Sequence, residues 1–533
     1  MTTTILVFVL MLLGYVGVAA FLARYIKNKD DFYVMGESAS TMLTVGTLAA
    51  TYLSAVTLLG IAGVSYSEGP LVIATLGSFG AWIGTLIAIV YIGRKMKAMH
   101  CRTMMDFFDK RFNNKWVSVV ALILMIVGLL GYGIIQLIGA GHVLAEITSI
   151  PFPMIIIMFT VALMLFCSLS GMYGVVYTDT MMFFTMLAIS FFIAPTLIDK
   201  AGFDNMRNLS ETLPGFWSLG GVNDRPLGWS ISQFLVWILF FACTPALVSR
   251  VFPAKNDFVL LKTAVIGIFF APAMQVLVFL AAGAMQVLQP GIEPVDRAMI
   301  VGFMEFTSPG VAGVGLAGLM ASIMSTASTL FVLTGFALAR DLYEKLFDRE
   351  VSERKGVVLG RVSQAIVALI VCLFAIAQPA GVYWISIYAG AIFAVAWLPT
   401  IVASMEWQRM NAKAALACML VGSGTFVIVG ELARQNVITL PQHIDSLMIS
   451  VVAGTVALIV AGLKYSPSAY ELERFRELKS LSLSKATIAE FMKTSSGRQL
   501  LVKEYRRVWA IAIGFIVIAV VMWGFFFLKL GVN

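Results

Sequence analysis

The sequence predicts an all-α polytopic membrane protein with about 14 transmembrane helices. Hydrophobic residues make up 60% of the chain and charged residues only 12%, whereas a soluble domain is about a quarter charged. The mean hydropathy is +0.92, and the apolar residues fall in long continuous blocks. Because about 20 residues of helix cross the hydrocarbon core, and a helix satisfies its own backbone hydrogen bonds there, each block predicts a membrane-spanning helix.

The apolar blocks follow one another along the whole chain. The first begins directly after the Thr2–Thr4 run, without the basic segment or cleavage site of a signal peptide, so we expect it to be retained. The fourth and ninth blocks are long enough to require tilt or an extension beyond the bilayer. The predicted spans are 4–25, 42–66, 71–93, 117–147, 152–173, 176–199, 228–249, 259–288, 310–339, 358–377, 381–404, 414–431, 446–463 and 509–529.

Basic residues gather in alternate loops, as the positive-inside rule requires. If the N-terminus lies outside, the cytoplasmic loops around 94–115, 250–255, 340–355 and 464–507 hold most of the Lys and Arg residues. We therefore expect a multi-pass protein of the plasma (inner) membrane, with both termini outside. The loops on the opposite side hold only Lys200, Arg207, Arg225, Arg297, Arg434 and Lys529.

Several function classes find no support in the sequence. The five cysteines are scattered and the three histidines lie far apart, so we expect no disulfide framework and no metal motif. The net charge of +8 does not indicate nucleic acid, and nothing resembles a nucleophile–base pair or a phosphate-binding loop. The soluble stretch 464–508 is too short for a catalytic domain and is expected to be a helical cytoplasmic linker. These observations favour movement of a small solute across the membrane over catalysis.

Hydroxyl side chains cluster in the middle of the span at 310–339. Four of them share one helix face at spacing i, i+3, i+4 and i+7, and a fifth lies on the adjoining flank. A hard monovalent cation needs several oxygen ligands, and such a face can supply two or three. Alternatively, small hydroxylated residues let helices pack closely and bond to their own carbonyls. The four aligned residues are Ser322, Ser325, Thr326 and Thr329, and the fifth is Ser328.

The segment 47–63 combines hydroxyl side chains with Gly60 and Gly63, which weaken a helix locally. A helix interrupted in the middle of the membrane exposes backbone carbonyls that can coordinate an ion, and a half-helix end that can face a solute. A glycine-rich packing face is the other interpretation. The sequence therefore predicts either a broken helix or a close helix contact in this segment.

Asp179 lies near the cytoplasmic start of the span at 176–199. Because an ionisable group inside the membrane is costly without a partner, its carboxylate is a candidate ion ligand or a partner of Arg250. A residue at the membrane interface is the third interpretation. Gln136 is an amide in the fourth span that either contacts a solute or bonds to a neighbouring helix. By their positions alone, Trp237 and Phe240 suit packing or lipid contact.

Five motifs in order resemble those of the sodium:solute symporters and cover most of the chain. The sequence departs from that family at three places: before the sixth span, where a Gly-Gly pair is common; in the sixth span, where an amide is often found; and in the seventh span, where many relatives have glycine and glutamine. These departures, Ser170-Gly171, Met182 and Cys243-Thr244-Pro245, bear on the solute and not on the fold. The matching motifs are Asp31–Glu37, Leu59–Tyr66, Thr103–Phe112, Met324–Thr326 and Ala339–Tyr343.

The resemblance implies a leucine-transporter-like core of two inverted five-helix repeats. The first repeat would cover 42–199 and the second 228–404, joined by an extracellular loop at 200–227. Residues 1–41 would add one helix and a cytoplasmic loop before the core. Residues 405–533 would add three peripheral helices, with the loop at about 464–508 between the last two.

The resemblance also implies roles for individual positions. A sodium site shared across the family would use two carbonyls of the broken helix and three hydroxyls facing it, which are Ala50, Leu53, Ser322, Ser325 and Thr326. A second sodium ion, found in some members, would bind at Asp179, Ser328 and Thr329. Solute contacts would lie near Tyr52, Ser54, Thr57, Gln136, Trp237 and Phe240, the last as part of an inner gate.

The sequence thus predicts a non-enzymatic symporter that couples a small organic solute to sodium by alternating access. Its expected partners are the solute, one or two sodium ions and the lipid bilayer. The segments 136–141 and 54–57 resemble members that carry monocarboxylates or carboxylate vitamins, so we expect such a solute. A neutral sugar or amino acid stays open, because no obvious Lys or Arg inside the membrane would pair a carboxylate. Proton coupling through Asp179 and a non-transporting membrane sensor are further alternatives.

Overall fold

The computed structural model describes residues 2–25, 35–74, 76–338, 353–378, 380–441, 444–480 and 492–500, with scattered positions beyond. Over this part of the chain the elements are all helices, and extended backbone pairs only at an isolated bridge between Ala39 and Ala254. The predicted all-helical class is confirmed. The expected span 509–529 and the motif Ala339–Tyr343 lie outside the continuous described ranges.

The helices follow the apolar blocks of the sequence. Up to residue 212 they are α1 Thr2–Leu22, η1 Ala23–Tyr25, η2 Met35–Glu37, α3 Thr41–Tyr52, η3 Val56–Ile61, α4 Ala62–Glu68, α5 Pro70–Ala74, α6 Leu76–Leu86, η4 Ile87–Gly93, α7 Arg94–Ala98, α8 Met104–Phe112, α9 Lys115–Ile147, α10 Phe152–Ala188, η5 Ile189–Ile193, α11 Ala194–Ala201 and α12 Phe203–Thr212.

The remaining helices continue from residue 227. They are α13 Leu227–Cys243, α14 Pro245–Val248, α15 Asp257–Leu288, η6 Val295–Arg297, α16 Ala298–Phe306, α17 Pro309–Phe336, α18 Glu353–Ala377, α19 Val382–Ile392, η8 Phe393–Trp397, α20 Leu398–Glu406, α21 Ala412–Arg434, α22 Ser446–Lys464 and α23 Ala469–Ser480.

Short polar side chains determine where several long helices begin. An Asn or Asp precedes the first helical residue, and its side chain accepts a hydrogen bond from a backbone N–H two or three positions further on. These bonds satisfy N–H groups that lack a partner at a helix N-terminus. The capping residues of α9, α15, α21 and α22 are Asn114, Asn256, Asn411 and Asp445.

Two predicted spans are interrupted, and one predicted boundary falls within the range of a helix. The span at 42–66 bends by 50° between α3 and η3. The span at 228–249 breaks at Thr244, which has an extended backbone, before Pro245 starts α14. The boundary expected between 173 and 176 falls within the range of α10. Two apolar segments lie on either side of Ser170 and Gly171, at Phe152–Cys167 and Met172–Ala201.

Among the described residues, nine helices are long and apolar enough to cross a membrane, or ten when the bent pair counts as one span. Two shorter apolar helices, Phe152–Cys167 and Leu227–Cys243, come in addition. These counts support a protein with many membrane spans and fall short of confirming the predicted number of 14.

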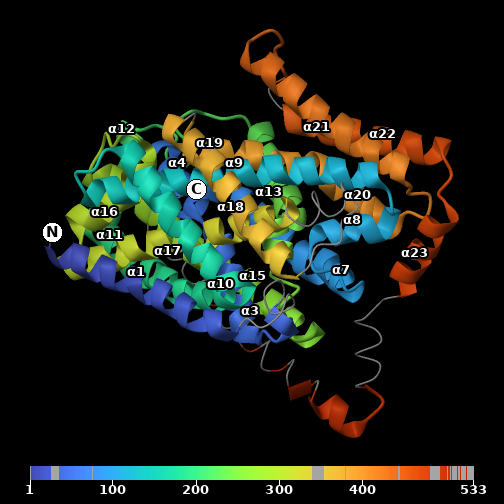
Figure 1. Cartoon of the computed structure of the whole chain (residues 1–533). Helices are drawn as coiled ribbons and strands as arrows, with labels where there is room; N and C mark the ends of the chain where they lie inside the picture. The colour runs from blue at the N-terminus through green and yellow to red at the C-terminus, as the bar shows by residue number, and fades with distance from the viewer. Residues whose placement is uncertain are drawn as a thin grey trace.

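The centre of the molecule is formed by α17 and the helices around it. The most apolar window of α17 is entirely buried, whereas only 17% of that of α1 is. Helices α3, α9, α10 and α18 all pack against α17. In Figure 1, α1 runs along one edge of the molecule and the α21–α22 pair lies at another, so both flank the buried helices.

Candidate functional site

The chain leaves the helical path between α3 and η3. Leu53 has φ −84° and ψ 79°, outside the helical region. The Ser54 N–H donates to the Tyr52 carbonyl (3.2 Å) instead of the Ala50 carbonyl. Likewise, the Thr57 N–H donates to Ser54 (3.0 Å) instead of Leu53. The break therefore frees the carbonyls of Ala50 and Leu53 from their helical partners, as an ion-coordinating segment requires.

The hydroxyl face of α17 meets this break. The Ser325 hydroxyl donates to the Ala50 carbonyl at 2.9 Å, and the Thr326 hydroxyl donates to the Ser322 carbonyl at 3.1 Å. These residues and Leu53 have no exposed surface. The two predicted halves of the first sodium site thus lie against each other and present neutral oxygens, the ligand type that hard cations take. The donor set fits a sodium ion.

A cavity lies beside this contact, on the side of α9 and α13. It is lined by residues of α3, α9, α13, α17 and η8, among them Thr51, Tyr132, Phe240, Thr326 and Phe393. Thr326 is a predicted sodium ligand and Phe240 a predicted solute contact. One residue predicted for each site therefore lines the same cavity.

Several predicted solute contacts surround the broken segment. The Ser54 hydroxyl lies 3.3 Å from the Tyr132 hydroxyl, and the Gln136 side-chain carbonyl accepts the Ala55 N–H at 3.4 Å. The Thr57 hydroxyl donates to the backbone carbonyl of Tyr52. Ser54, Thr57 and Gln136 thus lie together at the break. Because Gln136 accepts through its oxygen, its amide NH₂ group is directed elsewhere.

Aromatic rings form the wall opposite the break. The rings of Trp237 and Phe240 lie 6.2 Å apart, and Phe240 stacks on Phe393 at 6.1 Å and tilts against Tyr132 at 5.7 Å. Among the described residues, the amide NH₂ of Gln136 is buried without a hydrogen-bond partner, whereas the Trp237 indole faces Tyr383, with the ring centroids 6.5 Å apart. A buried donor without an acceptor is costly, so a bound molecule with an acceptor oxygen would satisfy the Gln136 amide.

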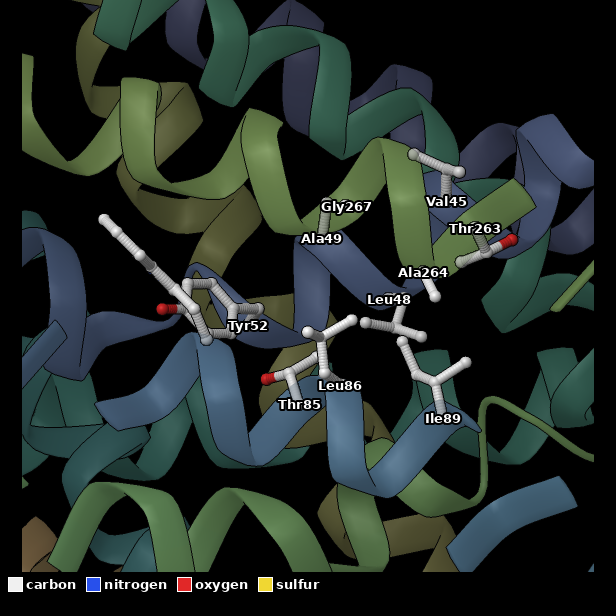
Figure 2. A pocket seen from close by; sticks show the side chains of 11 residues that line it. Val45, Leu48, Ala49, Tyr52, Thr85, Leu86, Ile89, Thr263, Ala264 and Gly267 are labelled. Carbon is white, nitrogen blue, oxygen red and sulfur yellow. The ribbon is translucent and has the colours of Figure 1, made fainter. Parts of the chain in front are cut away.

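The Tyr52 hydroxyl points away from this group. Its hydroxyl donates to the Gln275 side chain at 3.2 Å, and the Trp82 indole donates to the same oxygen at 2.9 Å. Figure 2 shows Tyr52 at the end of a second cavity, whose apolar lining comes from α3, α6 and α15 and includes Leu48 and Leu86. The Tyr52 hydroxyl is thus directed to Gln275, while its ring contacts Phe241, which in turn packs on Trp237 and Phe240.

Asp179 of α10 forms a buried ion pair with Arg250, which follows α14. The guanidinium lies 2.9 Å from the carboxylate, and both side chains are at most 1% exposed. The Thr47 hydroxyl donates to the same carboxylate oxygen at 2.7 Å. The Arg250 guanidinium also donates to the Thr329 hydroxyl, whereas the Ser328 hydroxyl donates to the Ser325 carbonyl at 3.0 Å. Of the three interpretations of Asp179, the ion pair with Arg250 is the one present.

Sequence reasoning missed several residues of the site. Tyr132 and Phe393 line the cavity, and the Tyr383 hydroxyl donates to the Gln233 side chain at 2.6 Å behind Trp237. The Cys243-Thr244-Pro245 sequence marks the second break, and Pro245 was its available signal because proline favours the first turn of a helix. Tyr132 and Phe393 carried no such signal, since aromatic residues are common throughout the apolar blocks.

Comparison with known proteins gives consistent results. The chain is 26% identical over 454 residues to the osmoregulated proline transporter OpuE of Bacillus subtilis (strain 168), and the alignment covers 81% of this chain and 89% of OpuE. It is 24% identical over 466 residues to the sodium/pantothenate symporter of Escherichia coli (strain K12), and the alignment covers 84% of this chain and 95% of that symporter.

Solved structures share the fold. A Na⁺-coupled sialic acid symporter in a substrate-bound outward-open state superposes with a TM-score of 0.71 at 15% identity, over 87% of this chain and 98% of that chain. Mhp1, a nucleobase-cation-symport-1 family transporter, gives a TM-score of 0.56 at 12% identity, over 84% and 99% of the two chains. The sodium:solute symporter family matches residues 32–422. The chain therefore belongs to the sodium:solute symporter family.

Proposed function

We propose that this protein carries a small organic solute across the cell membrane together with sodium, by alternating access. The observation that carries the proposal is the contact at 2.9 Å between the Ser325 hydroxyl and the freed Ala50 carbonyl. A sodium ion held by Ala50, Leu53, Ser322, Ser325 and Thr326 would tie the broken helix to α17. Binding from outside would therefore stabilise the arrangement that receives the solute.

The membrane supplies the driving force in this mechanism. A potential of 100 mV contributes about 2.3 kcal/mol for each elementary charge that crosses the membrane. Each sodium ion adds its concentration gradient to this term. The solute is released inside because sodium leaves a site that faces a lower sodium concentration and a negative potential.

We extend the proposal to the architecture and the orientation. The chain would have 14 spans, with inverted repeats at 42–199 and 228–404 and both termini outside the cell. The bend between α3 and η3 in the first repeat and the break at Thr244 in the second support it. In both repeats the first span is then the interrupted one, and inverted-repeat transporters bind their ions and solutes at such interrupted helices. The sequence and the relatives favour a transporter over an enzyme.

The solute is proposed to be a monocarboxylate or a carboxylate vitamin. The free amide donor of Gln136 calls for an acceptor oxygen, and the N-terminal end of η3 presents its positive dipole at the break. Named relatives carry proline and pantothenate, and both compounds bear a carboxylate. A neutral sugar or amino acid is the alternative, because hydroxyl and zwitterionic groups also accept from this donor. Competition for uptake in proteoliposomes between each solute and its amide or ester would separate the two classes.

Thermal unfolding of the purified protein in matched sodium, potassium and choline chloride tests the proposed coupling ion. An ion that binds only the folded state raises its stability by about 2.7 kcal/mol at a hundredfold excess over Kd. We expect a rise specific to sodium that Ser325→Ala abolishes. Equal stability in all three salts would contradict sodium coupling and would make a proton the first coupling ion to test, beginning with Asp179.

A further inference from the structure

The group formed by Asp179, Arg250 and Thr329 connects three parts of the fold. Besides its ion pair, the Arg250 guanidinium donates to the Thr51 hydroxyl at 3.0 Å and contacts the Met172 sulfur at 3.2 Å. These partners lie on α3 and α10, and Thr329 lies on α17. Arg250 therefore occupies the place where the broken helix and the hydroxyl face of α17 meet α10.

This place coincides with the predicted second sodium site. That site would use the Asp179 carboxylate and the Thr329 hydroxyl, and the guanidinium holds both. One carboxylate oxygen receives both Arg250 and Thr47, and the other, Oδ1, has no hydrogen-bond partner among the described residues. A sodium ion at Oδ1 would lie next to a buried guanidinium, and two like charges at this separation repel strongly in a poorly screened interior.

The segment that carries Arg250 is held in place on the same side. The Ala39 N–H donates to the Pro253 carbonyl at 2.9 Å, and the Lys255 N–H donates to the Ala39 carbonyl at 3.0 Å. The Lys97 ammonium donates to the Phe252 carbonyl at 2.8 Å. Removal of the guanidinium from Asp179 would require this segment to move, because the arginine side chain enters from a backbone bonded on two sides.

The two cation sites therefore differ in charge. The first site, at Ala50, Leu53 and Ser325, offers carbonyls and hydroxyls that carry no formal charge, so a sodium ion brings the only positive charge there. At Asp179 one negative charge already faces one positive charge, both fully buried. A sodium ion at Oδ1 would share this single carboxylate with the guanidinium, so two positive charges would lie side by side against one negative charge and repel each other.

We propose that the Arg250 guanidinium is the resident cation of the Asp179–Thr329 site, so that the protein couples one sodium ion to each solute molecule. This inference rests on the proposed sodium-coupled function and replaces the expected second sodium ion with a tethered cation. The tethered charge stays with the protein, so only the ion at Ala50, Leu53 and Ser325 adds its charge to the driving force.

Equilibrium binding of ²²Na⁺ to the purified full-length protein tests the inference without knowledge of the solute. We expect one ion per chain with a Hill coefficient near one, and no binding in Ser325→Ala. Two ions per chain in the wild-type protein would overturn the inference and leave the proposed function intact. No sodium binding at all would overturn the proposed function and the inference with it.

Replacement of the arginine provides the second test. Arg250→Gln removes the tethered charge and keeps hydrogen-bond donors, so we expect two sodium ions per chain. The double variant Arg250→Gln/Asp179→Asn, which also removes the carboxylate, should return to one ion. Arg94→Gln is the matched control, because it breaks the ion pair with Asp257 (2.6 Å) away from both sites; it should keep one ion. If the single variant does not fold, the count in the wild-type protein decides; a folded single variant that still binds one ion would overturn the assignment.

Discussion

At the scale of single residues, the hydroxyl groups of α17 have two functions that the structure separates. The Ser322, Thr326 and Thr329 hydroxyls donate to carbonyls of their own helix, which satisfies them inside the membrane. The Ser325 hydroxyl donates to a carbonyl of its own helix, Ser322, and also to the Ala50 carbonyl of α3. The bonds to the helix's own carbonyls are therefore present, and the bond to Ala50 is the feature that separates a candidate ion site from ordinary helix packing.

The first prediction concerns Thr326. Replacement of Thr326 by Ala should weaken sodium binding about tenfold, the effect of losing one ligand worth about 1.4 kcal/mol. Thr41→Ala, at the start of α3, is the control and should leave sodium binding unchanged. The measurement is the sodium concentration that gives half of the sodium-dependent rise in Tm. Equal shifts in the two variants would contradict the first sodium site.

Asp296 illustrates how a loop carboxylate can be held at a helix end. Its carboxylate accepts the Val382 N–H at the start of α19, at 3.1 Å. Burial raises the pKa of the Asp296 carboxyl above its usual range, and the bond from Val382 opposes that change. The folded protein thus binds this proton more strongly than the unfolded chain, so the ionised carboxyl costs stability as the pH rises through the raised pKa.

The second prediction follows from that sign. Asp296→Asn keeps an acceptor for the Val382 N–H and removes the charge. Its Tm should match that of the wild-type protein at acidic pH, below the ordinary pKa of an aspartate, and should exceed it increasingly as the pH rises toward 7. Asp204→Asn, at an exposed position of α12, is the control and should show no growing difference. A gap that shrinks with rising pH would refute the assigned role of Asp296.

At the scale of elements, glycines allow η3 and α4 to pack closely against the start of α19 and against η6. A Cβ at Gly60 would lie 3.0 Å from the Tyr383 nitrogen at the start of α19. A Cβ at Gly63 would lie 2.9 Å from the Val295 carbonyl oxygen of η6. The break at Leu53 and the packing at these glycines are therefore separate features. The sequence offered them as alternatives, and the structure contains both.

The third prediction tests this packing. Gly60→Val should destabilise the protein by about 1–3 kcal/mol, the usual cost of overpacking, because backbone atoms of α19 have to move. Gly424→Val in α21 is the matched control, since nothing lies within 4 Å of its added Cβ. The comparison is the Tm of the two variants in detergent. A similar Tm for both would mean that η3 and α19 are not packed as closely as described.

At the scale of the whole molecule, ion pairs group residues by the side of the membrane on which the sequence places them. Arg94–Asp257, Lys97–Glu37 and Lys95–Glu406 join residues expected at the cytoplasmic side. Arg225–Glu68 and Arg297–Glu146 join residues expected outside. If the predicted number of spans between the two members of a pair were wrong by one, the prediction would place them on opposite sides of the membrane. The pairs therefore support the alternation of the loops. Which side faces the cytoplasm stays a prediction from the basic residues.

The end of the molecule that holds α8 and α23 has its own anchor, Arg111 of α8. Its buried guanidinium donates to the carbonyls of Ser404 (3.0 Å), Glu471 (3.1 Å) and Met410 (3.3 Å). Burial lowers the pKa of Arg111 to about 10, and the nearby Glu471 carboxylate opposes this change. At neutral pH the side chain is therefore charged and ties α23 to the loop between α20 and α21.

The fourth prediction tests that anchor. Arg111→Met should destabilise the protein by roughly 2–3 kcal/mol, because it leaves buried carbonyls without donors. It should also speed protease cleavage in the 464–508 segment as α23 detaches. Arg476→Met, on the exposed side of α23, is the control and should be cleaved at the wild-type rate. Unchanged cleavage in Arg111→Met would contradict the role of Arg111 in holding α23.

The sequence by itself determined the membrane-spanning character, the family and most helix limits of this protein. The predicted span 446–463, for example, corresponds to α22 at Ser446–Lys464. This follows from local physics: an apolar run must form a helix in lipid because its backbone has no other hydrogen-bond partners.

Only the tertiary structure decided which polar groups meet. It placed Ser325 against Ala50, turned Tyr52 toward Gln275, and set Arg250 on Asp179. These contacts join residues separated by 71 to 275 positions, and no periodic pattern along the chain encodes such pairings. Because an unpaired polar group inside the membrane is costly, packing of the helices selects these partners, and the candidate ion and solute sites exist only after that packing is complete.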